Sequence, residues 1–248
     1  MKNPNALINS DYGPIIININ DSIIGKYISQ TGFWANEDII IIKEMIDFLL
    51  IKKEKVTFYD VGANIGTHSL ALSKIFNEKI SIRAFEAQRI VFNMMCGTFA
   101  LNGLSNVYCH NLAVSNTSDE IIEFQSPDYN LQNNFGGLEI IAPNFSDNHL
   151  MNKLKLENIN TITLDSFNEQ VDFIKMDIEG MEDKALLGAK LILEKYKPIC
   201  FIEILKTNSN SLFDTLIESG YCGFKKNNDL IAIPVEFNIG INGLDRLF

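Results

Sequence analysis

The sequence predicts an α/β protein built on a doubly wound, mostly parallel sheet, with a small N-terminal β/α region and a long central insertion. Three observations favour this class. From Val56 onward, short apolar runs alternate with longer segments in which apolar residues recur at helical spacing. A glycine-rich segment, residues 60–66, lies between the first of these runs and a helix-like stretch. Glu86 ends the next apolar run, where a nucleoside-binding βαβ unit places an acidic residue.

The N-terminal region, residues 1–52, predicts short strands followed by one helix. The apolar run 15–17 predicts a strand, Asn20-Asp21 a turn, and the apolar pair Ile23-Ile24 further β structure. Asn36 is expected to cap the helix, because acidic residues follow it and stabilise a helix N-terminus. The apolar residues of this helix recur at helical spacing: Ile39, Ile42, Met45, Ile46 and Leu49.

Residues 53–234 form the predicted core, in which strands and helices alternate. The expected elements are strand 56–61, helix 66–76, strand 80–86, helix 89–102, strand 106–114, strand 171–177, helix 181–196, strand 199–204 and helix 210–219. Gly103, Lys197-Pro198 and Gly220 end three of the helices. Asn227-Asn228 predicts a closing hairpin, and residues 235–248 a C-terminal tail. We expect residues 1–248 to form one domain, since a chain of this length buries roughly 70–75% of its unfolded surface.

A central insertion, residues 120–165, breaks the alternation. Ser126-Pro127, Asn133-Asn134 and Gly136-Gly137 give it the composition of a loop. Loops of this length are usually functional or disordered, so an acceptor-site lid and an insertion without function are both open. Residues 159–164 alternate apolar and polar side chains, which indicates an extended strand that returns to the sheet.

Composition excludes several classes of protein. The formal net charge of −10 disfavours binding to a phosphate backbone, so nucleic acid is not expected as a partner. The four cysteines are far apart and form no Cys-x-x-Cys pair, which is typical of reduced core residues of an intracellular protein. No run approaches the ~18 apolar residues of a membrane span, and no signal peptide is evident. A cytoplasmic protein is therefore expected.

A second cluster of polar residues lies in segment 172–180. Phe173, Lys175 and Asp177 face the same way on a strand, because side chains alternate. Asp177 and Glu179 are expected at the carboxyl end of that strand, where open α/β sheets bind ligands. The alternative is that one of these acids only caps the helix expected near Met181.

Together these segments resemble the FkbM family of S-adenosylmethionine-dependent methyltransferases. The resemblance covers residues from about 20 to 205 and depends on four segments: Asp60-Val61-Gly62-Ala63-Asn64-Ile65-Gly66, Phe85-Glu86, Leu101-Asn102-Gly103-Leu104 and Ile174-Lys175-Met176-Asp177-Ile178-Glu179-Gly180. Asn134-Phe135-Gly136-Gly137 is similar to a family feature of the insertion. Ala87 departs from the family, which commonly has proline there. The resemblance implies a class I, Rossmann-like fold.

The resemblance further implies methyl transfer from S-adenosylmethionine to oxygen, on a sugar or related small molecule in glycan or natural-product biosynthesis. Asp60 and the N–H groups around residues 62–67 would hold the amino acid end of the cofactor, and Glu86 the ribose. The predicted cofactor-binding residues are Asp60, Gly62, Asn64, Gly66, Thr67, His68, Glu86, Ala87, Leu112, Ala113 and Asp177. Residues 111–113 would flank the adenine.

Methyl transfer needs an acceptor oxygen in line with the methyl group and a base within hydrogen-bond reach of its proton. Asp177 and Glu179 are the candidate bases, Lys175 would tune their charge, and Glu203 is a third acid. His68 is a candidate for contact with cofactor or acceptor, or else a solvated helix residue. His110 is expected to be structural, and an acceptor role for His149 is open.

Other interpretations remain. No metal is assigned, although three carboxylates at adjacent strand ends also suit a hard divalent cation, and a chelator that leaves turnover unchanged would exclude this. A nicotinamide-dependent oxidoreductase would share the βαβ unit, but its third glycine and a Tyr-x-x-x-Lys pair are missing. A catalytically silent scaffold would bind the cofactor and methylate nothing.

Overall fold

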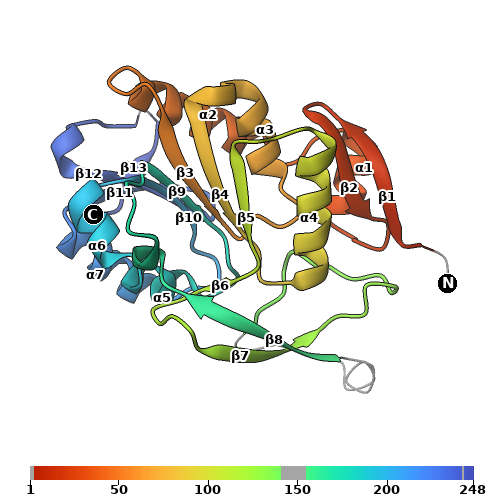
Figure 1. The fold of residues 1–248 in the computed structure, drawn as a ribbon. Helices are drawn as coiled ribbons and strands as arrows, with labels where there is room; N and C mark the ends of the chain where they lie inside the picture. The colour runs from red at the N-terminus through yellow and green to blue at the C-terminus, as the bar shows by residue number, and fades with distance from the viewer. Residues whose placement is uncertain (1–2, 141–154, 242) are drawn as a thin grey trace.

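The computed structural model describes residues 3–140, 155–241 and 243–248. Its main feature is an eight-stranded sheet in the order β13-β11-β12-β10-β9-β3-β4-β5 (Figure 1). Five strands run parallel: β3 (Val56–Val61), β4 (Ile80–Phe85), β5 (Val107–His110), β9 (Phe173–Met176) and β10 (Ile199–Glu203). Three run antiparallel to their neighbours: β11 (Tyr221–Lys226), β12 (Asp229–Pro234) and β13 (Asp245–Arg246). The predicted fold class is confirmed.

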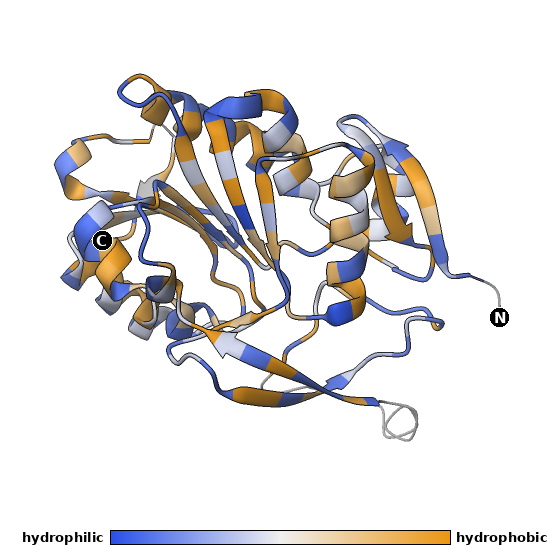
Figure 2. Cartoon of the chain, in the orientation of Figure 1, coloured by the Kyte–Doolittle hydropathy of each residue, from blue (hydrophilic) through white to orange (hydrophobic). Residues whose placement is uncertain are grey.

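Helices cover both faces of this sheet, as a doubly wound fold requires. One face packs against α2 (Asn36–Leu50), α3 (Thr67–Phe76) and α4 (Arg89–Leu101); the other packs against α5 (Glu182–Leu187), α6 (Lys190–Tyr196) and α7 (Ser209–Glu218). Successive strand residues serve opposite faces, since Phe58 packs in the first layer and Tyr59 in the second. The central strands are accordingly rich in hydrophobic residues (Figure 2).

The N-terminal region differs from the prediction. Its hairpin consists of β1 (Asn5–Ser10) and β2 (Gly13–Asn18), so a strand was missed. The polar residues of β1 hid it, because this strand has no fully buried face. Ile23-Ile24 leads into helix α1 (Ile24–Thr31) rather than a strand. The hairpin packs against α4 at Ile16, whose side chain lies over Gly97 and whose N–H donates to the Thr98 hydroxyl at 3.0 Å.

The predicted cap of α2 is wrong. Ala35, in the left-handed region with φ of 52°, precedes the helix, and Asn36 is its first residue. The Asn36 Oδ1 atom is buried and accepts no hydrogen bond within the described part of the chain. Glu37 and Asp38 do lie in the first turn, so the acidic residues mark the start of the helix correctly.

The insertion is not a loop at its ends. β7 (Ile121–Ser126) and β8 (Lys155–Ile162) pair antiparallel, and β6 (Ala113–Val114) joins β8 in a three-stranded sheet. The expected strand 106–114 is therefore two strands in two sheets. Between them, the Asn111 amide donates to the carbonyl oxygens of Glu86 at 2.8 Å and Ala87 at 3.0 Å. Residues 141–154 lie outside the described residues.

The remaining elements follow the prediction with two differences. The expected helix 181–196 is interrupted at Gly188, where a Cβ atom would overlap the carbonyl oxygen of Ser115. The hairpin at Asn227-Asn228 joins β11 to β12 as predicted. The expected tail contributes β13 to the sheet edge. Among the described residues there are also short 3₁₀ helices: η1 (Asn77–Lys79), η3 (Leu164–Phe167) and η4 (Val235–Phe237).

In the part of the chain that the structure describes, no helix has the length and apolar character to cross a membrane.

The carboxyl ends of β3, β4, β9 and β10 meet at one edge of the sheet, where open α/β sheets bind ligands.

Candidate active site

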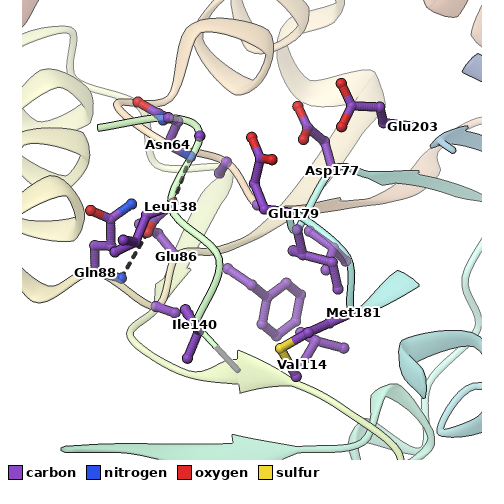
Figure 3. A pocket seen from close by; sticks show the side chains of 18 of the residues that line it. Asn64, Glu86, Gln88, Val114, Leu138, Ile140, Asp177, Glu179, Met181 and Glu203 are labelled. Atoms are coloured by element: carbon purple, nitrogen blue, oxygen red, sulfur yellow. Dashed lines mark hydrogen bonds between the residues drawn. The ribbon is translucent and has the colours of Figure 1, made fainter. Parts of the chain in front are cut away.

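A cavity opens at this edge of the sheet. It contains about 1060 Å³ of space that protein atoms do not fill, its open mouth included. Its walls come from the ends of β3, β4, β9 and β10, from residues 112–114, and from residues 134–140 of the insertion. Figure 3 shows Glu86 and Gln88 at one end and Asp177, Glu179 and Glu203 at the other.

The glycine loop after β3 brings the backbone close to this cavity. Gly62 has a φ of 79°, and a Cβ atom there would overlap the carbonyl oxygen of Asp177, so only glycine is accommodated. Gly62, Asn64 and Thr67 line the cavity as predicted. Gly66 does not line it: it caps α3 with a φ of 88°, and its missing side chain makes room for the Phe99 ring.

Glu86 is the best-defined group at one end of the cavity. Its side chain is 6% exposed and accepts backbone hydrogen bonds from Asn64 at 3.0 Å and from Gln88 at 2.7 Å. Burial raises the pKa of Glu86 to about 7, and the two backbone donors oppose that rise. A buried carboxylate that is already held by two donors has a fixed orientation and keeps lone pairs for a ligand.

Apolar side chains surround this end. Leu112, Ala113 and Ala87 line the cavity as predicted. Val114, Leu138, Ile140 and Met181 line it as well, and Figure 3 shows Val114 beside Met181 and Leu138 beside Gln88. The walls suit a flat heterocycle whose polar sugar contacts Glu86.

Lys175 is a buried cation in the middle of the cavity wall. The side chain of Lys175 donates to the Gly62 carbonyl oxygen at 3.1 Å and lies 3.7 Å from both Asp60 Oδ1 and Asp177 Oδ2. Burial lowers the pKa of this lysine, but Asp177 and Asp60 outweigh burial, and the pKa is raised. Lys175 is therefore charged at neutral pH.

Asp60 does not line the cavity. It is fully buried beneath the wall, where its Oδ2 accepts a hydrogen bond from Ser69 at 2.7 Å. Its Oδ1 atom has no hydrogen-bond partner among the described residues and faces Lys175. The structure places Asp60 behind Lys175 and outside the lining of the cavity, so its predicted contact with the cofactor stays a prediction that the lining does not support.

The predicted catalytic acids come together. One carboxylate oxygen from each of Asp177, Glu179 and Glu203 lies within 4.8 Å of the other two. Glu179 has a φ of 54° and forms an ion pair with Lys206 at 2.6 Å. Burial, followed by the negative charges of Asp177 and Glu179, raises the pKa of Glu203 to about 8. These oxygens are of the type that hard cations prefer.

Neither Asp177 nor Glu179 caps the next helix, so that alternative is wrong. Glu182, in the first turn of α5, accepts hydrogen bonds from the backbone N–H groups of Ile178 at 2.8 Å and Gly180 at 3.0 Å.

The histidines differ in position. His68 lines the cavity and is 8% exposed, so it is not a solvated helix residue. Burial, followed by the charge of Lys175, lowers the pKa of His68, which leaves its imidazole neutral at pH 7. His110 lies outside the cavity wall and stacks on Phe85 with 4.9 Å between ring centroids, which agrees with a structural role. His149 lies outside the described residues.

A family model described as the methyltransferase FkbM domain matches residues 60–226, well over half of the chain. The chain belongs to the FkbM methyltransferase family. This membership confirms the resemblance found in the sequence and the predicted class, a methyltransferase that depends on S-adenosylmethionine.

Several solved structures are similar to this chain. The FkbM methyltransferase from Methylobacillus flagellatus KT is 19% identical with a TM-score of 0.50, over 73% of this chain and 44% of that one. A tRNA (uracil-54, C5)-methyltransferase from Pyrococcus abyssi, solved with S-adenosyl-L-homocysteine, is 10% identical with a TM-score of 0.47, over 94% of this chain and 44% of that one. TYW2 from M. jannaschii, solved with AdoMet, is 14% identical with a TM-score of 0.44, over 94% of this chain and 85% of that one.

The likeness to the Methylobacillus flagellatus protein shows the fold alone. This chain spans less than half the length of the first two proteins. No curated protein matches the chain. The comparisons do not support the predicted exclusion of nucleic acid as a partner, which stays a prediction.

Sequence reasoning missed several residues that line the FkbM cavity: Trp34, Gln88, Leu138, Ile140 and Met181. Only Gln88 had a local signal, its position two residues after Glu86. Met181 directly follows the motif that ends at Gly180, but its apolar side chain gave no sign of a site. Trp34 follows α1, and residues 138 and 140 follow the Asn134-Phe135-Gly136-Gly137 segment.

Glu203→Gln is expected to raise the free energy of unfolding of this FkbM protein by about 1 kcal/mol at pH 8.5 and to leave it unchanged near pH 4. The folded pKa of Glu203, about 8, exceeds the ordinary value of 4.5, so its stabilising contribution is present below pH 4.5 and is lost as the pH rises through 8. Glutamine stays neutral throughout. Urea unfolding at both pH values checks this, and equal stabilities at pH 8.5 would contradict it.

Proposed function

We propose that the protein transfers a methyl group from S-adenosylmethionine to a hydroxyl oxygen of a small polyhydroxylated acceptor such as a sugar. One observation carries the proposal: a single cavity holds a nucleoside-type carboxylate, Glu86, at one end and three clustered carboxylates at the other. The first end suits the cofactor, and the second suits an acceptor that donates hydrogen bonds and loses a proton.

The residues present fit S-adenosylmethionine. Glu86 would accept hydrogen bonds from the ribose hydroxyls, and the apolar walls around Leu112 and Ile140 would hold the adenine. The N–H groups of the loop that leads into α3, with the charged Lys175, would hold the carboxylate of the amino acid end. When bound, the cofactor supplies an electrophilic methyl group on a sulfonium.

The protein's own contribution is to position the acceptor and to take its proton. Asp177 would orient the acceptor hydroxyl, because its side chain is 40% exposed and faces the cavity beside Lys175. Glu203 suits the proton acceptor, since a base works best when its pKa lies near the working pH and the pKa of Glu203 is about 8. Glu179 is paired with Lys206 and is less free to act.

A neutral acceptor fits this end of the cavity better than an anionic one. Asp177, Glu179 and Glu203 would repel phosphate groups, and the chain carries a net charge of −10. We therefore infer that the acceptor is a sugar-like molecule, in glycan or natural-product biosynthesis, rather than a nucleic acid. The indole of Trp34, which also lines the cavity, offers an apolar face for a sugar ring.

Radiolabelled methyl transfer tests the proposal. The protein is incubated with S-adenosylmethionine labelled in its methyl group and with three acceptor classes in parallel: neutral oligosaccharides, sugar nucleotides and total RNA. We expect label in a saccharide fraction, with mass spectrometry showing an O-methyl group. Label confined to RNA would overturn the proposed acceptor class. Cofactor binding with no labelled product from a cognate cell extract would favour the silent scaffold.

A further inference from the structure

Part of the insertion crosses the end of the cavity that contains Glu86. Residues 133–140 run past Gln88 and Glu86, and Figure 3 shows Leu138 and Ile140 beside these two side chains. Leu138 and Ile140 also pack against a small apolar cluster of the three-stranded sheet. A ligand held by Glu86 would therefore be covered by this segment.

The first half of the segment is firmly anchored. The carbonyl oxygen of Asn133 accepts from Ser22 N–H at 2.8 Å, and Asn133 N–H donates to the Asn20 carbonyl oxygen at 3.0 Å. Phe135 is 2% exposed, and its carbonyl oxygen accepts a hydrogen bond from the Gln88 amide at 2.7 Å. Gln88 N–H in turn donates to Glu86, so this half is tied to the nucleoside carboxylate.

The second half is held differently. Lys206, in the loop after β10, donates to the Gly137 carbonyl oxygen at 3.2 Å and forms an ion pair with Glu139 at 3.4 Å. The same ammonium group forms the 2.6 Å ion pair with Glu179. Lys206 thus connects residues 137–139 to the acidic end of the cavity. Its side chain is 30% exposed, so these contacts can break without opening the core.

Two adjacent glycines separate the halves. Gly136 and Gly137 lie between the anchored Phe135 and the residues that Lys206 holds. Glycine permits large changes of backbone dihedral angles at low cost, and hinges are formed by a few such residues. The segment therefore has an anchored first half, a glycine hinge, and a distal part whose polar contacts with Lys206 can break.

We propose that residues 137–140 form a strap over the nucleoside end of the cavity and that Lys206 is the positioning residue that latches it. The strap has to release before S-adenosylhomocysteine can leave, so the Lys206 contacts set the rate of cofactor exchange. This inference depends on the proposed function, because it presumes a nucleoside cofactor at Glu86. Through Glu179, the latch also couples strap closure to the acids at the acceptor end.

Dissociation of labelled S-adenosylhomocysteine, chased with excess unlabelled compound, tests the latch. We expect Lys206→Met to increase the dissociation rate about 5- to 10-fold, which corresponds to about 1–1.4 kcal/mol. Lys206→Arg should stay within twofold of wild type, since arginine keeps the charge and its donors. Glu139→Gln, which leaves the Glu179 pair in place, should give a smaller increase than Lys206→Met. The matched control is Lys190→Met, which removes an exposed lysine paired with Glu218 at 3.3 Å.

Hydrogen–deuterium exchange of peptides that cover residues 133–140 gives a second measurement, made without ligand. We expect faster exchange in Lys206→Met than in wild type, with an unchanged unfolding temperature. An unchanged dissociation rate together with unchanged exchange would overturn the strap. Failure of the wild type to retain any S-adenosylhomocysteine would instead overturn the proposed function, so the two failures are distinguishable.

Discussion

Glu86→Gln is expected to weaken the binding of S-adenosylhomocysteine about 30- to 100-fold. The carboxylate is fixed by the backbone N–H groups of Asn64 and Gln88, and its remaining lone pairs would accept the ribose hydroxyls. A hydrogen bond to a charged group contributes about 1.5–3 kcal/mol, and glutamine offers one neutral acceptor oxygen in its place. Isothermal titration calorimetry measures the loss directly.

The variant is expected to fold. Because the pKa of Glu86 is raised to about 7, the buried charge costs stability above that pH, and the neutral amide removes this cost. Glu78→Gln is the matched control, since Glu78 is exposed and distant from the cavity wall. If Glu86→Gln bound the ligand within threefold of wild type, the assignment of the ribose site would be wrong.

Asp177→Asn is expected to lower kcat at least 100-fold while changing the affinity for S-adenosylhomocysteine less than tenfold. The side chain lies beside Lys175 at the acidic end of the cavity, where the acceptor hydroxyl would be oriented and deprotonated. Loss of the group that orients the acceptor hydroxyl for proton transfer costs on the order of 10²-fold, because a small misplacement of the reacting atoms slows the reaction by about that factor. Steady-state kinetics with the acceptor found by labelled methyl transfer gives the comparison.

The control for this variant is Asp214→Asn, at an exposed position of α7 far from the motifs. Turnover within tenfold of wild type in Asp177→Asn would remove this residue from the catalytic machinery. It would also leave Glu203 as the remaining candidate, which a pH–rate profile of Glu203→Gln addresses through the loss of an apparent pKa near 8.

The core of the fold could be predicted because its signals are local. The alternation of apolar strands and helical segments predicted the parallel sheet, and Asn227-Asn228 predicted the final hairpin. The errors arise where distant contacts decide. The expected helix is interrupted at Gly188, where the Ser115 carbonyl oxygen, distant in sequence, occupies the space of a Cβ atom and requires glycine. The chain leaves the main sheet at Asn111 because its amide is bound by backbone oxygens after β4.

In the candidate site, too, residues with a local signal could be predicted and residues that depend on distant contacts could not. Glu86, Asp177 and Gly62 belong to motifs whose spacing places them at strand ends, and the structure places all three on the cavity. Asp60 shares the first motif, but strand geometry turns it beneath the wall toward Lys175. Gln88 and Lys206 act on the insertion across the fold, and no local pattern marks a partner that lies so far along the chain.

A calorimetric titration of the purified protein with S-adenosylhomocysteine, run beside an identical titration with NAD, tests the nucleoside site most directly. We expect heat that saturates at one ligand per chain for S-adenosylhomocysteine, and no binding of NAD at the same concentrations. Saturable binding of NAD with none for S-adenosylhomocysteine, or no heat with either compound, would contradict the account.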